Sequence, residues 1–149
     1  MKKNFFVVIF FIFFEFILPN KSTAYSSDPK KFITEIVDEA KAILVDTNSQ
    51  EFKTEKLSEM ALEVVDIEGI GNYTLGSYRK KFSDDQMKEY RVLFKKYFLK
   101  SFTSRLTDYS EPKIEVLSIE VLNPKYVMVK SLLLATDKKP EVKIDWRVY

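Results

Sequence analysis

Apolar residues recur every three to four positions after residue 24, and this spacing predicts amphipathic helices. The first run begins with an N-cap residue and an N1 proline, Asp28 and Pro29, and continues to position 44. A second run with the same period covers residues 52–65. We therefore expect two helices that turn their apolar stripes toward a common core.

Two further helical segments follow. Residues 66–82 contain all three glycines of the chain, which predicts a short, irregular helix with a close backbone approach or a bend. Ser83 and Gln86 have the spacing of a capping box, so a long helix is expected to start there. Its predicted buried stripe is rich in aromatic residues: Met87, Tyr90, Leu93, Phe94, Tyr97, Phe98, Phe102, Leu106 and Tyr109.

Beyond position 112 the apolar period changes to two, and β-branched residues become frequent. We expect strands at residues 113–122, 126–136 and 141–148, joined by connections short enough for antiparallel hairpins. In the first strand the phase slips between Val116 and Leu117, which predicts a bulge or a strand that contributes to two surfaces. The predicted class is α+β, with about four N-terminal helices packed on a C-terminal antiparallel sheet of three strands.

Residues 1–24 have the pattern of a secretory signal peptide. Lys2 and Lys3 precede an apolar run over residues 5–14, and small residues end the segment at Ala24. A permanent membrane anchor is the alternative, but this run is shorter than the about 20 residues that a bilayer helix needs, and Glu15 interrupts the segment. We predict export, cleavage after Ala24, and one domain over residues 25–149.

Charge and composition narrow the function classes. The chain has 24 basic and 22 acidic residues, and the predicted mature part has 21 of each, so any electrostatic partner must be met by a local patch. A nucleic-acid partner is not expected. The chain has no His and no Cys, which removes the commonest metal ligands and the usual base and nucleophile. We predict no metal, no cofactor and no catalytic residue.

The densest basic stretch of the predicted mature chain has two interpretations. It can serve a headgroup or partner-docking role, or it can be a solvated helix face balanced by Asp84, Asp85 and Glu89. The stretch comprises Arg79, Lys80, Lys81, Lys88, Arg91, Lys95 and Lys96.

Three motifs resemble those of the MlaC-like, or toluene-tolerance, periplasmic phospholipid-binding proteins. The first covers residues 66–80, from D-I-E to Y-T-L-G-S-Y-R-K; the second is the aromatic stripe that ends at Tyr109; the third is V-K-I-D-W-R at residues 142–147. Their order along the chain matches the family as well. Members of the family continue with a further strand and a terminal helix, so the resemblance also implies that these closing elements are missing here.

The resemblance implies a non-enzymatic carrier that shuttles phospholipid between the outer membrane and an inner-membrane Mla-type ABC transporter and thereby maintains outer-membrane lipid asymmetry. Its implied partners are a phospholipid, the transporter complex and an outer-membrane lipoprotein. The helices and the sheet would enclose an apolar cavity. The residues expected to line it, each also consistent with an ordinary core position, are Ile67, Ile70, Leu75, Tyr78, Phe94, Phe98, Phe102, Val116, Val127, Val129, Leu132, Leu134, Ile144, Trp146 and Val148.

Two other interpretations stay open. One is a pocket for a small ligand or an enzymatic reaction, with Asp66 as base and Tyr73 and Tyr78 as donors in the manner of ketosteroid isomerase, although Asp66 is also placed to cap a helix. The other is a truncated family member without lipid binding, which acts as a structural or regulatory partner. Such a protein is expected to self-associate through the unpaired edge of its third strand.

Overall fold

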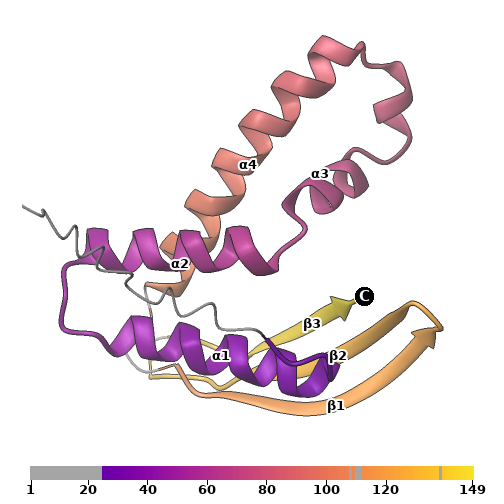
Figure 1. Cartoon of the computed structure of the whole chain (residues 1–149). Helices are drawn as coiled ribbons and strands as arrows, with labels where there is room; N and C mark the ends of the chain where they lie inside the picture. The colour runs from indigo at the N-terminus through magenta and orange to yellow at the C-terminus, as the bar shows by residue number, and fades with distance from the viewer. Residues whose placement is uncertain (1–24, 108, 110–111, 138) are drawn as a thin grey trace, which may run out of the picture.

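The computed structural model describes residues 25–107, 109, 112–137 and 139–149. The predicted signal peptide lies outside the described residues. Helices α1 (Pro29–Val45) and α2 (Gln50–Val64) are followed by α3 (Ile67–Leu75), the 3₁₀ helix η1 (Gly76–Lys81) and α4 (Asp84–Leu106). Strands β1 (Ile114–Asn123), β2 (Tyr126–Leu133) and β3 (Val142–Val148) form an antiparallel sheet in the order β1-β2-β3 (Figure 1). The predicted α+β layout and the meander are confirmed.

The helices begin where the sequence supplies a capping oxygen. The Asp28 carboxylate accepts a hydrogen bond from the Lys31 amide at 2.8 Å, and the Ser83 hydroxyl and Gln86 side chain form the predicted capping box. Asp66 caps α3 by accepting from the Gly69 amide at 2.8 Å. These side chains satisfy amides that would otherwise lack a partner in the first helical turn.

The sheet departs from its predicted boundaries in two places. The β1–β2 register shifts between Val116 and Ser118, so the predicted phase slip is a bulge. Strand β2 ends at Leu133, before the predicted end at residue 136, because Thr136 and Lys139 exchange backbone hydrogen bonds and close a turn. Strand β3 forms one edge of the described sheet, and self-association through this edge stays a prediction.

The core lies where α1 packs against α2 and one face of the sheet. Its buried members are Ile33, Ile36, Val37, Ala40, Leu44, Leu57, Met60 and Val129. Ser131 is also buried on this face, with 2% of its surface exposed, and its hydroxyl accepts a hydrogen bond from Trp146 Nε1 at 2.8 Å. The buried Ser131 hydroxyl therefore has a hydrogen-bond partner and does not weaken the core.

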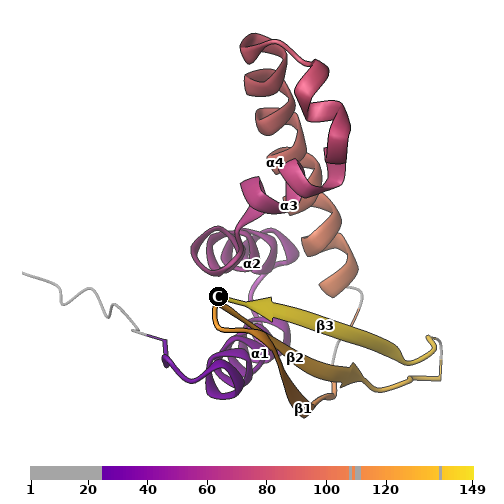
Figure 2. The same cartoon turned by 90° about the vertical axis from the view of Figure 1, so that its right-hand side faces the viewer.

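The helices α3, η1 and α4 form an arm that projects away from the sheet (Figures 1 and 2). The predicted buried stripe of α4 is wrong at Leu93 and Tyr97, whose side chains are 56% and 70% exposed. The N-terminal half of α4 packs against α3 on one side. The prediction assumed instead that a core covers the full length of the aromatic stripe. In the described part of the chain, no helix combines the length and apolar character needed to cross a membrane.

Candidate functional site

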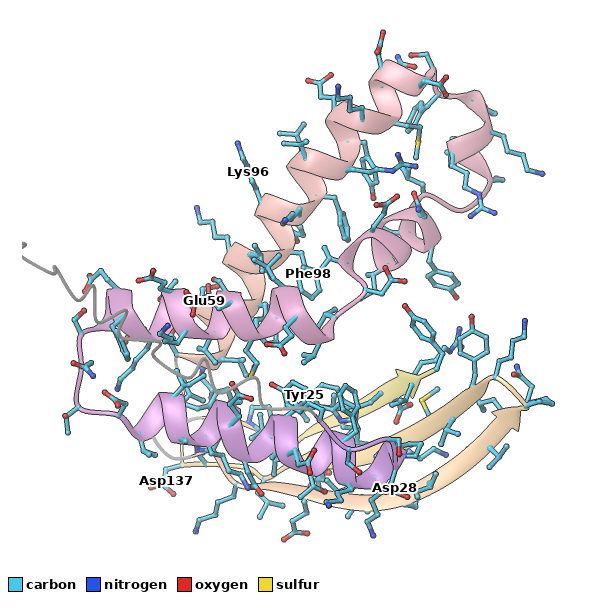
Figure 3. All side chains as sticks on the ribbon, in the orientation of Figure 1. Tyr25, Asp28, Glu59, Lys96, Phe98 and Asp137 are labelled. Atoms are coloured by element: carbon cyan, nitrogen blue, oxygen red, sulfur yellow. The ribbon has the colours of Figure 1, made fainter. Side chains whose placement is uncertain are left out.

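A row of aromatic rings runs along the inner side of α4. The ring centroids of Tyr90 and Phe94 lie 5.6 Å apart, those of Phe94 and Phe98 6.4 Å, and those of Phe98 and Phe102 5.9 Å. Residues four positions apart share one side of a helix, which explains the row. Figure 3 shows Phe98 on the side of α4 that faces α2 and α3. We call these four residues, which are all partly buried, the aromatic ladder.

Helix α3 packs closely against the outer end of the ladder. A Cβ atom at Gly71 would lie 2.9 Å from Cδ1 of Phe94, so no larger residue fits without movement. The Tyr90 hydroxyl donates to the Gly71 carbonyl oxygen at 3.0 Å. The predicted close backbone approach is therefore confirmed at Gly71, and the predicted bend at Gly76, where φ is 54°.

A groove opens between α3 and α4 at this contact. Its volume is about 180 Å³, and its lining is Ile67, Glu68, Gly71, Tyr90, Arg91, Val92, Phe94 and Lys95. Arg91 Nε lies 3.1 Å from Glu68 Oε1 and joins the two helices. Pockets for drug-sized ligands measure about 300–1,000 Å³, so this groove has room for a segment of one acyl chain rather than for a whole phospholipid.

The inner end of the ladder reaches the core. Phe102 packs against the buried cluster, and several of the predicted lining residues on the sheet do the same. The ladder thus connects two groups of predicted lining residues, one in the α3–α4 groove and one on the sheet. The group in the groove is Ile67 and Phe94, and the group at the core is Phe102, Val116, Val127, Val129, Trp146 and Val148.

Other predicted lining residues lie apart from the ladder. Leu132 pairs with Glu115 and Lys143, which places it on the sheet face opposite Val129. Leu134 follows the end of β2, and Ile144 is partly buried beside Ser131. The remaining three belong to the arm: Leu75 is partly buried, whereas Ile70 and Tyr78 are exposed.

The structure adds two apolar residues to the candidate lining, and the sequence analysis did not identify either of them. Ile119 pairs with Val129 and Val121 pairs with Val127, so both side chains are on the face of the sheet that carries the core. They are nevertheless 44% and 73% exposed. The bulge between Val116 and Ser118 reverses the alternation, and a count of inward positions that ignores it misses both residues.

The end of the sheet meets the base of the arm. The Asp66 carboxylate raises the pKa of the Tyr149 hydroxyl, chiefly through its negative charge, and the Tyr149 ring lies 5.9 Å from that of Tyr126. Figures 1 and 2 both show α3 above the end of β3. In the alternative enzymatic group, Asp66 caps α3, and Asp66, Tyr73 and Tyr78 are all exposed.

A model of the MlaC family, described as MlaC protein, matches residues 34–149, which run from within α1 to the end of β3. The chain belongs to the MlaC family. No curated protein matches it. Proteins of the MlaC family are periplasmic and act in phospholipid binding and transport; the family is not one of enzymes.

Proposed function

We propose that this MlaC-family protein is a carrier that takes phospholipid between the outer membrane and an inner-membrane ABC transporter of the Mla type. Its partners would be the phospholipid, the transporter complex and an outer-membrane lipoprotein, and its activity would maintain outer-membrane lipid asymmetry. The observation that carries the proposal is the aromatic ladder, which provides a continuous apolar track from the α3–α4 groove to the core.

The ladder suits acyl chains for an energetic reason. Each methylene removed from water contributes about 0.8 kcal/mol, so a lipid with two long chains stays with a carrier only if most of its methylenes are covered. The groove has room for a segment of one chain. We propose that the ladder, which includes the predicted lining residues Phe94, Phe98 and Phe102, contacts the rest together with the exposed residues Ile119 and Val121.

We further propose that residues 1–24 are a signal peptide removed after Ala24. The periplasmic location of the family supports export. The first described residue is also packed in place: the Tyr25 hydroxyl donates to the Glu39 carboxylate, and its ring meets the edge of Phe32 at 5.5 Å. Tyr25, the first residue after the proposed cleavage site, is therefore part of the packed domain.

The test is to express residues 1–149 in a bacterial host and to purify the exported protein without detergent. Native mass spectrometry followed by lipid extraction should show about one diacyl phospholipid per chain, and the intact mass should correspond to a chain that starts at Tyr25. A folded, exported protein without lipid would contradict the carrier, and an uncleaved protein retained in the cell would contradict the signal peptide.

A further inference from the structure

The outer part of the arm, residues 76–100, carries a positive charge that the rest of the chain balances. It holds three acidic residues and eight basic ones, which gives a net charge of +5. The rest of residues 25–149 holds 13 basic and 18 acidic residues, a net charge of −5. The eight basic residues are Arg79, Lys80, Lys81, Lys88, Arg91, Lys95, Lys96 and Lys100. A neutral chain thus has a strongly basic segment, which comprises η1 and most of α4 in the arm (Figure 1).

Most of this charge is not neutralised within the protein. Arg91 pairs with Glu68, but across the described residues none of the other seven cations lies in an ion pair. Lys81 lies over the Tyr78 ring, 5.1 Å from its centroid, an arrangement that leaves its charge intact. Asp84 and Asp85 are in the first turn of α4, where they interact favourably with the helix dipole.

The same surface exposes large apolar side chains. Leu93 and Tyr97 are one turn apart on α4, and Lys96 and Lys100 follow each of them by three positions, so the four share one side of the helix. Figure 3 shows Lys96 pointing away from α3. In all, five exposed apolar or aromatic residues lie in the same segment as the cations: Tyr78, Phe82, Val92, Leu93 and Tyr97.

We propose that residues 76–100 dock on the surface of a bilayer that contains anionic phospholipids. Lysine and arginine attract anionic headgroups, while tyrosine and leucine side chains enter the boundary between headgroups and acyl chains. An acidic protein surface is the competing occupant, and the vesicle experiment below distinguishes it from a bilayer. The ladder begins in the same arm, at Tyr90, so docking would bring the α3–α4 groove next to the lipids. Only this last step, the approach of the groove to the lipids, rests on the proposed carrier function.

The test is co-sedimentation of the exported full chain with vesicles of phosphatidylcholine, with and without phosphatidylglycerol. Lys96→Gln/Lys100→Gln should weaken binding to the anionic vesicles about 20- to 30-fold, because each cation near such a surface is worth about a factor of five. Leu93→Ser/Tyr97→Ser should weaken it at least about tenfold. The matched control is Lys125→Gln/Lys143→Gln, which removes two exposed cations from the sheet and should change binding less than about twofold.

Several results would overturn the proposal. The first is equal binding to neutral and anionic vesicles. The second is no binding by the unmodified protein, which would leave an acidic protein as the occupant. The third is a loss of binding in the control variant equal to that in Lys96→Gln/Lys100→Gln. Circular dichroism of each variant checks the fold, which should not change because the substituted side chains are exposed. Native mass spectrometry of the same samples separates the two proposals. A lipid-loaded protein that does not bind vesicles refutes only the docking proposal. A lipid-free protein that binds vesicles refutes only the carrier proposal.

Discussion

Replacing Gly71 by alanine tests the contact that holds α3 against the aromatic ladder. The new Cβ would lie 2.9 Å from Cδ1 and 3.2 Å from Cγ of Phe94, and both atoms belong to a rigid ring whose centroid lies 6.4 Å from that of Phe98. Either the ring turns out of the ladder or α3 moves away from α4. Movement of α3 would also lengthen the 3.0 Å hydrogen bond from the Tyr90 hydroxyl to the Gly71 carbonyl oxygen.

The contributions of this substitution to the free energy of unfolding have opposite signs, but the destabilising ones are larger. Alanine in place of glycine inside a helix stabilises by about 1 kcal/mol. Overpacking costs about 1–3 kcal/mol, and the weakened hydrogen bond costs about 1 kcal/mol more. We therefore expect Gly71→Ala to lower the free energy of unfolding by about 1–3 kcal/mol, which corresponds to a fall in Tm of about 4 °C per kcal/mol for a domain of this size.

Urea unfolding followed by circular dichroism measures this change. The double variant Gly71→Ala/Phe94→Ala provides the control, since alanine at position 94 removes Cγ and Cδ1, the ring atoms nearest the new methyl group. If the reasoning holds, the double variant loses less free energy of unfolding than the two single variants lose together, by about 1 kcal/mol or more. A Gly71→Ala protein as stable as the unmodified one, or more stable, would refute it.

Two further changes concern other contacts. Trp146→Phe removes the donor to the buried Ser131 hydroxyl and should lower the free energy of unfolding by about 1–3 kcal/mol in urea titrations; an unchanged midpoint would show that this hydrogen bond contributes nothing. Burial and the Glu39 carboxylate raise the pKa of Tyr25, so its contribution to stability is complete below about pH 10 and is lost as the pH rises further. Tyr25→Phe should therefore reduce the fall in Tm between about pH 9 and about pH 11, and a fall equal to that of the unmodified protein would contradict this.

Much of the fold follows from local signals in the sequence. Asp28, Asp66 and Ser83 cap helices where their side-chain chemistry predicts, since an N-cap depends on residues within one turn. The bulge beside Val116 is visible as a break in the alternation of apolar residues. These features need no knowledge of distant contacts, which explains why the element order and the sheet topology were predicted correctly.

The parts that depend on tertiary packing were harder to predict. Leu93 and Tyr97 have helical spacing suitable for a core, but the sequence does not reveal that α4 extends beyond the sheet and leaves them exposed. Leu132 is as apolar as its neighbours, and its face is fixed only by its pairing with Glu115 and Lys143. The predicted lining therefore mixed two faces of the sheet, whereas the aromatic spacing on α4 identified the ladder residues.

Photo-crosslinking tests most directly whether acyl chains lie along the aromatic ladder. A photoreactive phenylalanine analogue is placed at position 98, on the side of α4 that faces α2 and α3, and in a matched variant at position 96, where Figure 3 shows Lys96 pointing away from α3. Both exported proteins are irradiated and analysed by mass spectrometry for covalently attached phospholipid. The proposed site predicts a lipid adduct at position 98 and little or none at position 96. No adduct at position 98, or equal adducts at both positions, would contradict it.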